Sequence, residues 1–123
     1  MKPAPAYVPA HGLLRGKSVL VTAAAGAGIG FSVAKRAAEE GRRALFISDV
    51  HERRLNEAVD SLKKETGLQE VYGQLCDVSN EEQVQALVGA AEDKLGGIDV
   101  LVNNAGLGTS RRVVDMDDSE WHK

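Results

Sequence analysis

The chain has 123 residues, enough for one domain, and its 43% hydrophobic and 27% charged residues are typical of a globular protein. Fifteen basic against 18 acidic residues give a net charge of -3, which argues against nucleic acid or a membrane surface as the main partner. A single cysteine, Cys76, excludes an internal disulfide and favours a cytoplasmic location. No apolar stretch has the length of a membrane span or of a signal peptide.

Residues 1–12 contain all three prolines and are expected to form a flexible arm, followed by one domain at 13–123. Residues 17–22 (KSVLVT) predict a buried strand, because they are rich in apolar and β-branched side chains and are followed by a glycine-rich loop. The helix predicted at 29–40 presents small apolar residues at helical spacing and ends before Gly41.

Two further strand–helix pairs and a last strand follow. The apolar spacing predicts them at 44–48, 52–66, 70–76, 79–95 and 98–102. Ser79 is expected to cap the third helix. Asp117 and Glu120 have the spacing of a capping box for a fourth helix, which has barely begun at Lys123. Strands that alternate with helices indicate βαβ units, and hence a parallel sheet with right-handed crossovers.

The loop after the first strand, LVTAAAGAGIG at 20–30, consists mostly of alanine and glycine. Small residues let backbone amides approach phosphate oxygens closely, and the start of a helix adds partial positive charge, so the loop suits a pyrophosphate. The spacing is Gly26-Ala-Gly28-Ile-Gly30, which departs from GxGxxG because position 31 is Phe. A tight strand-to-helix turn without a ligand stays open as the alternative.

Polar or small residues follow each of the other strands. Asp49 stands 19 residues after Gly30, where a dinucleotide fold places the acid that binds the adenosine ribose hydroxyls. Capping of the next helix is the alternative role for this residue. Asp77-Val78 follows the third strand and residues 103–106 follow the fourth. Open parallel sheets bind ligands at the edge where the carboxyl ends of their strands meet, so we expect these residues to lie together.

Four segments carry a resemblance to a known family: VTAAAGAGIG at 21–30, ISD at 47–49, CDV at 76–78 and LVNNAG at 101–106. In these segments the sequence resembles the short-chain dehydrogenase/reductase family, over everything from about Gly12 onward. The resemblance implies an α/β fold with a Rossmann-type, doubly wound parallel sheet, here truncated after strand four with the order 3-2-1-4. It also implies hydride transfer between a nicotinamide cofactor and an alcohol or carbonyl, and a homo-oligomer when complete.

The resemblance further implies roles for individual residues. Gly26, Gly28, Ile29 and Gly30 would hold the pyrophosphate, Asp49 the adenosine ribose, Asp77 and Val78 the adenine, and Asn104, Ala105 and Gly106 the nicotinamide-side ribose. Family members with an acid at Asp49 and no basic residue in the glycine loop usually prefer NAD over NADP, and both conditions hold. Contact of Arg53-Arg54 with the 2′-phosphate of NADP would let the protein use both NAD and NADP, but the carboxylate of Asp49 opposes binding of that phosphate. The chain departs from the family at Ala23, where most members have Gly, and its loop is one residue longer.

The catalytic residues of the family are absent from this sequence. The family uses a tyrosine with a lysine four residues later, but Tyr7 is followed at this distance by His11 and Tyr72 by Cys76. The catalytic serine and asparagine of the family would lie beyond Lys123. The three histidines of the chain do not have the spacing of metal ligands. We therefore expect the cofactor-binding half of an NAD-dependent oxidoreductase for a secondary alcohol or ketone, inactive by itself. A dinucleotide-binding module without turnover and a nonfunctional remnant remain alternatives.

Two further expectations concern partners. TAAAGAGIG at 22–30 and SDVHERR at 48–54 are faintly similar to actinobacterial members that act on steroid-derived or acyl-thioester substrates. The strand at 98–102 lies at the edge of the truncated sheet. Its apolar edge would be bare, which predicts self-association of the chain.

Overall fold

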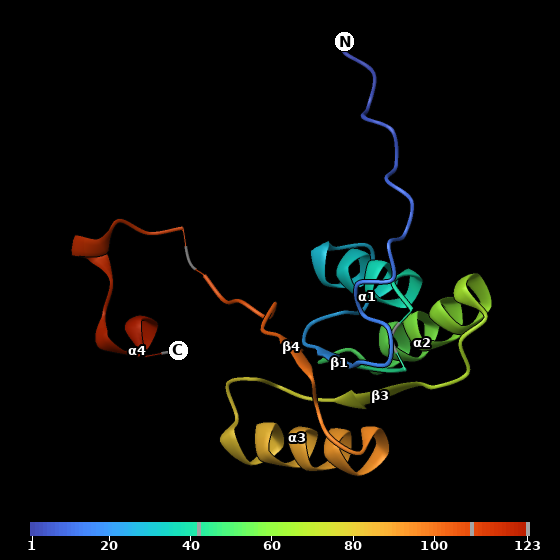
Figure 1. Ribbon diagram of the computed structural model, residues 1–123. Helices are drawn as coiled ribbons and strands as arrows, with labels where there is room; N and C mark the ends of the chain where they lie inside the picture. Colours follow the sequence, from blue (N-terminus) through green and yellow to red (C-terminus); the bar gives the residue numbers. More distant parts are fainter. Residues whose placement is uncertain (42, 109, 123) are drawn as a thin grey trace.

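A computed structural model describes residues 1–41, 43–108 and 110–122, and it shows helices on both faces of a parallel sheet (Figure 1). In chain order the elements are β1 (Ser18–Val21), α1 (Ile29–Glu39), β2 (Ala44–Asp49), α2 (Glu52–Thr66), β3 (Val71–Leu75), α3 (Glu81–Leu95), β4 (Val100–Val102), the 3-10 helix η1 (Val113–Asp115) and α4 (Asp118–Trp121). The strand order is β3-β2-β1-β4, and each pair is parallel. The predicted fold class and strand order are therefore confirmed.

Strand β1 lies in the interior of the sheet, between β2 and β4, and all four of its residues are buried. It pairs with β2 through Val21 and Ile47 and with β4 through Val21 and Val102. These last pairs lie at the carboxyl ends of β1 and β4. The residues that follow the strands therefore gather at one edge of the sheet.

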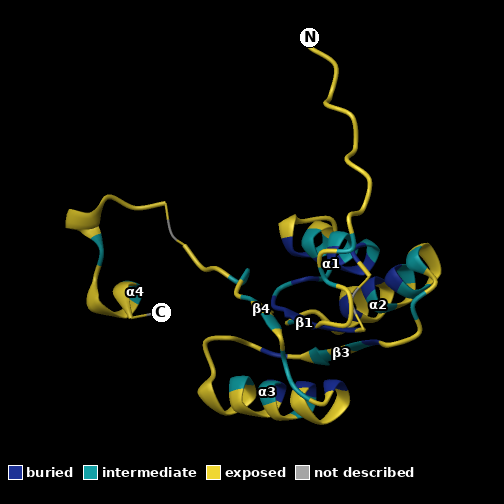
Figure 2. Cartoon of the chain, in the orientation of Figure 1, coloured by how far each residue is buried: buried dark blue, intermediate teal, exposed yellow. Residues whose placement is uncertain are grey.

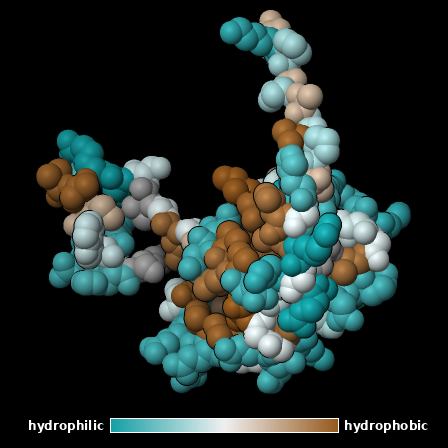
Figure 3. Space-filling view, in the orientation of Figure 1, coloured by the Kyte–Doolittle hydropathy of each residue, from teal (hydrophilic) through white to brown (hydrophobic). Residues whose placement is uncertain are grey.

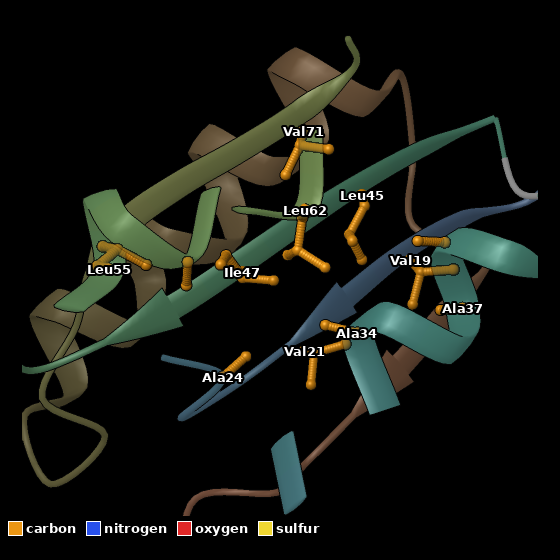
Figure 4. Close-up of a cluster of buried hydrophobic side chains, with 12 residues drawn as sticks. Val19, Val21, Ala24, Ala34, Ala37, Leu45, Ile47, Leu55, Leu62 and Val71 are labelled. Atoms are coloured by element: carbon orange, nitrogen blue, oxygen red, sulfur yellow. The ribbon is translucent and has the colours of Figure 1, made fainter. Parts of the chain in front are cut away.

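Two hydrophobic clusters, one on each face, hold the layers together (Figure 2). Successive side chains of a strand point to opposite faces, so β1 and β2 contribute to both clusters. Val19, Val21, Leu45 and Ile47 meet residues of α1 and α2 in the first cluster (Figure 4). Leu20 and Phe46 meet Leu87, Ala91 and Leu95 of α3 in the second. Helices α1 and α2 thus cover one face and α3 the other, as right-handed crossovers require.

Helix α3 begins later than the sequence predicts. Asn80 is its N-cap, and the Asn80 side chain accepts the N–H of Gln83 at 3.1 Å. The prediction that Ser79 caps this helix is wrong. Ser79 instead donates its N–H and its hydroxyl to the Asp77 carboxylate, at 2.9 and 2.6 Å. Asn and Ser are about equally good N-caps, so the competing Asp77 decides between them.

The capping box at the fourth helix is confirmed. Asp117 accepts the N–H of Glu120, whose side chain accepts the N–H of Asp117 in return. The helix that follows, α4, has four residues.

The segment after β4 extends away from the sheet (Figure 1). Four of its large apolar side chains are between 68% and 85% exposed, namely Leu107, Val113, Val114 and Trp121. Leu101 of β4 is 50% exposed, and Figure 3 shows apolar surface both on the extended segment and on the body beside it. The last strand and the residues after it thus present unburied apolar side chains to solvent.

In the part of the chain that the structure describes, no helix combines the length and the apolar character needed to cross a bilayer.

Two glycines allow a matched test of the packing between sheet and helices. A Cβ on Gly73 of β3 would lie 2.9 Å from Cγ2 of Val59 and 3.2 Å from Cδ1 of Leu55, whereas one on exposed Gly89 of α3 would meet nothing within 4 Å. We expect Gly73→Ala to lower the free energy of unfolding by about 1–3 kcal/mol through overpacking. We expect Gly89→Ala to raise it by about 0.5–1 kcal/mol, because alanine favours the helix. Urea denaturation measures both, and a shift in the same direction would contradict this packing.

Candidate functional site

The strand ends and the glycine-rich loop meet in a cavity at the carboxyl edge of the sheet. The cavity has a volume of about 130 Å³ and is lined by Ala23, Asp49, Val50, Cys76, Asp77, Val78, Ala105, Gly106 and Leu107. These residues come from the segments that follow β1, β3 and β4 and from the end of β2. The structure thus brings together the strand-end residues that the sequence predicts to lie close.

Gly26 and Gly28 leave the glycine-rich loop open. Gly26 has φ +87°, a conformation that favours glycine, and a Cβ on either residue would meet nothing within 4 Å. Gly28 is the N-cap of α1, and no side chain caps the helix there. Ile29, the first helical residue, is 78% exposed. The start of α1 therefore offers backbone donors and partial positive charge beside an unobstructed surface.

Gly30 has a different function from the other loop glycines. A Cβ at Gly30 would lie 2.4 Å from the carbonyl oxygen of Ala23 and 2.5 Å from Nδ2 of Asn104. These distances are shorter than real contacts allow, so the residue is glycine because α1 starts directly against the loop and the β4 end. Gly30 therefore serves the fold whether or not a ligand binds.

Thr22 and Asn104 tie the end of β1 to the end of β4. The hydroxyl oxygen of Thr22 accepts the N–H of Asn104 at 3.0 Å and of Ala105 at 3.1 Å. In return, Nδ2 of Asn104 donates to the carbonyl oxygens of Thr22 and Ala23, each at 3.1 Å. The Asn104 side chain is therefore engaged with the loop. Sequence reasoning missed the part of Thr22, although its place between the strand and the glycine-rich loop was a signal.

Ala23 has a backbone conformation that suits glycine. Its φ is +51°, in the left-handed region, which costs an L-residue about 1–2 kcal/mol. The Ala23 carbonyl accepts from Asn104, so a hydrogen bond holds the residue in this conformation. The loop therefore carries a strained residue directly after Thr22.

The carboxylate of Asp49 accepts three backbone N–H groups. Oδ1 accepts from Val50 at 2.8 Å and His51 at 3.2 Å, just before α2, and Oδ2 accepts from Ala25 at 3.0 Å. The alternative role as a support for the next helix is thus present in the structure. The bond to Ala25 also fixes the distance between the glycine-rich loop and the end of β2.

Cys76 and Asp77 form the β3 side of the cavity. Cys76 is buried, and this burial raises the pKa of its thiol. Its N–H donates to the Asp49 carbonyl oxygen at 3.0 Å. Hydrogen bonds from the Ser79 hydroxyl and N–H hold the pKa of the Asp77 carboxyl below its ordinary value. Asp77 therefore stays ionised at neutral pH, and Val78 beside it is 40% exposed.

Comparison with known proteins decides the family. The model of the short chain dehydrogenase family matches residues 17–123. The chain belongs to the short-chain dehydrogenase/reductase family.

Two similar proteins come from Mycobacterium species. A short chain dehydrogenase of Mycobacterium smegmatis is 54% identical in sequence with a TM-score of 0.88, and the match covers 97% of this chain and 48% of that structure. In Mycobacterium tuberculosis, the curated "(5R,7aS)-5-hydroxy-7a-methyl-1-oxo-2,3,5,6,7,7a-hexahydro-1H-indene-carboxyl-CoA reductase" is 50% identical over 120 residues, 98% of this chain and 45% of that protein. The chain thus spans about half the length of these short-chain dehydrogenases.

Solved members of the family contain either nicotinamide cofactor. L-sorbose reductase of Gluconobacter frateurii, complexed with NADPH and L-sorbose, has a TM-score of 0.80 at 34% identity, over 89% of this chain and 40% of that one. A member from Burkholderia phymatum in complex with NAD has a TM-score of 0.77 at 37% identity, over 88% and 37%.

Two glycines at the candidate site test the role of Gly30 in this short-chain dehydrogenase fold. Gly106 lies at the cavity, and a Cβ there would meet nothing within 4 Å. We expect Gly30→Ala to lower the free energy of unfolding by at least about 1–3 kcal/mol, because the methyl group overlaps backbone that cannot move away easily. Gly106→Ala is the control and is expected to change it by at most about 0.5 kcal/mol. Guanidinium denaturation compares the two, and equal effects would refute the close approach at Gly30.

Proposed function

We propose that the chain is the dinucleotide-binding half of an NAD-dependent short-chain dehydrogenase/reductase, which transfers hydride between nicotinamide and a secondary alcohol or ketone. The cavity at the sheet edge carries the proposal, because its walls come from all four strand ends. Open parallel sheets bind nucleotides at this edge. NAD supplies or accepts the hydride when bound, and the residues of this chain bind and orient it.

Gly26, Gly28, Ile29 and Gly30 are proposed to hold the pyrophosphate. The open space at Gly26 and Gly28 supports this, because a phosphate can approach the backbone there without meeting a side chain. The uncapped start of α1 adds the donors and the partial positive charge that an anion needs. The residues of the loop therefore fit a diphosphate.

Asp49 is proposed to bind the hydroxyls of the adenosine ribose. Its carboxylate lies 3.0 Å from the amide of Ala25, so a ribose bonded to it would lie directly beside the loop that holds the pyrophosphate. A carboxylate at this place repels a 2′-phosphate, which supports NAD over NADP.

NADP use by the same site is the second candidate, and Arg54 favours it. Arg53 forms an ion pair with Glu57 at 3.0 Å, but Arg54 has no acidic partner among the described residues. Both arginines line a hollow that includes Gly26. A cation in the first turn of a helix opposes the helix dipole, so an anionic ligand would offset an existing cost there.

The other predicted residues are assigned to the two ends of the dinucleotide. Val78 is proposed to face the adenine with its exposed apolar side chain, next to Asp77 in the same cavity. Ala105 and Gly106 line that cavity and are proposed to lie against the nicotinamide-side ribose with Asn104. Because the Asn104 side chain is bonded to the loop, its contribution would come through the main chain.

We further propose that this chain binds the cofactor without turning over a substrate. Its tyrosines do not line the cavity at the strand ends: the Tyr7 hydroxyl donates to Glu39, and the Tyr72 hydroxyl donates to Glu70. Neither has a lysine four residues later. For the chain by itself, this favours a binding module over an active dehydrogenase.

The substrate of the complete protein is proposed to be an acyl thioester with a ring ketone or alcohol. The support is the 50% identity to a reductase whose name denotes a coenzyme A ester of a hydroxylated bicyclic ketone.

We propose a cytoplasmic homo-oligomer for the complete protein. For this chain we propose self-association through β4, where Leu101 is half exposed and β1 is the neighbouring strand.

Calorimetric titration of NADH and then NADPH into the chain tests the proposal. We expect saturable binding that is tighter for NADH. Asp49→Asn keeps the shape of the side chain and removes its charge, so NADH affinity is expected to fall roughly tenfold to hundredfold, the equivalent of about 1.5–3 kcal/mol. NADPH affinity is expected to stay or rise.

Asp60→Asn is the matched control, because Asp60 is an exposed acid of α2 away from the cavity. We expect it to change neither affinity. Binding of neither cofactor by the folded chain would refute the proposed function, and tighter binding of NADPH would favour the second candidate.

A further inference from the structure

Residues 7–14 lie against the C-terminal end of α1, although this segment contains no strand or helix (Figure 1). The contacts use the main chain of the segment. Oε2 of Glu40 accepts the N–H of His11 at 2.9 Å and of Leu13 at 3.1 Å. The Glu40 carbonyl oxygen accepts the N–H of Leu14 at 3.1 Å. The end of α1 therefore binds the main chain of this segment.

Arg36 holds the earlier part of the same segment. Its guanidinium donates to the carbonyl oxygens of Val8 at 2.5 Å and Pro9 at 3.1 Å. The guanidinium also lies 5.3 Å from the centre of the Tyr7 ring, within reach of a cation–π interaction. Arg36 forms an ion pair with Glu40 at 2.6 Å, so the two side chains form one linked clamp.

The position of Glu40 indicates that the clamp exists for the segment. The Glu40 side chain is only 4% exposed, and a buried carboxylate is costly unless it is paired. An acid at the C-terminal end of a helix also opposes the helix dipole. Within the helix, the ion pair with Arg36 offsets part of this cost, and the amides of His11 and Leu13 supply the remaining partners of the carboxylate. The amide of Leu13, followed by that of His11, holds the pKa of the Glu40 carboxyl below its ordinary value.

The clamped segment is connected to the glycine-rich loop in two ways. Tyr7 lines a hollow that also includes Gly26 and Ala27 of the loop. Leu14 packs against the cluster shared by α1, α2 and the sheet. Helix α1 has 11 residues and a length of roughly 16 Å, so a restraint at its C-terminal end limits the tilt of its N-terminal end.

We propose that residues 7–14 are a strap that fixes α1, with Glu40 and Arg36 as positioning residues for the glycine-rich loop. The effect on the loop needs no ligand, and only its consequence for dinucleotide affinity rests on the proposed function. The folded unit then begins at about residue 7.

Amide hydrogen exchange of the chain tests the strap. In Glu40→Ala we expect exchange at His11 and Leu13 to accelerate, and exchange at Ala25 and Ser32 in and after the loop to accelerate about tenfold. Both amides are hydrogen-bonded in the structure: that of Ala25 to Asp49 and that of Ser32, in the first turn of α1, to the Gly28 carbonyl oxygen. Amides of α3 serve as an internal control and are expected to keep their rates.

Two matched variants sharpen the test. Glu40→Gln keeps an acceptor for the two strap amides and is expected to restore most of the protection. Deletion of residues 1–6, which make no hydrogen bond or ion pair with the described part of the chain, is expected to change nothing. If Glu40→Ala unfolds the whole chain, deletion of residues 1–9 decides, because it removes the Arg36 contacts and leaves Glu40.

The proposal would be overturned if Glu40→Ala accelerated exchange at His11 and Leu13 but left the rates at Ala25 and Ser32 unchanged. It would also be overturned if the strap amides of the wild-type chain exchanged as fast as those of a free peptide. NADH titration of the same variants separates the two proposals. Accelerated loop exchange in a chain that binds no dinucleotide would uphold the strap and refute the proposed function.

Discussion

The hydrogen bonds between Thr22 and Asn104 hold the carboxyl edge of the sheet together. They join the residues that follow β1 and β4, and these two segments form part of the wall of the cavity. Asn104 also bonds the carbonyl oxygen of Ala23, which has a positive φ, and it lies so close to the first turn of α1 that position 30 has room only for glycine. The direction of α1, and hence the place where its backbone donors meet solvent, depends on this contact.

The carboxyl edge of the sheet has partial positive charge at the start of α1 and negative charge at the ends of β2 and β3. The start of α1 attracts an anion, whereas Asp49 and Asp77, each held by N–H donors, place negative charge at the ends of β2 and β3. A ligand that fits this arrangement has its anionic group at the loop and hydroxyl groups at Asp49. The proposed ligand, a diphosphate joined to a ribose, has both groups in this order.

The sequence was sufficient to predict the elements and the gathering of strand ends, because alternating strands and helices leave few topologies for a parallel sheet. It was insufficient where two local choices compete: Ser79 and Asn80 are both good caps, and Asp77 decides between them by binding Ser79. It was also insufficient for contacts between distant residues. The clamp at Glu40 and the strained backbone of Ala23 depend on partners 27 to 81 positions away, which no local pattern reveals.

Mapping amide chemical shifts of the chain during a titration with NADH tests the central claim most directly, because it reports where the ligand lies rather than how tightly it binds. The account predicts that the largest shifts fall on residues 23–30, 49–51, 76–78 and 104–107, at the carboxyl edge of the sheet. Shifts confined to the groove between α3 and β4, around Val84, Leu87 and Leu101, would contradict it.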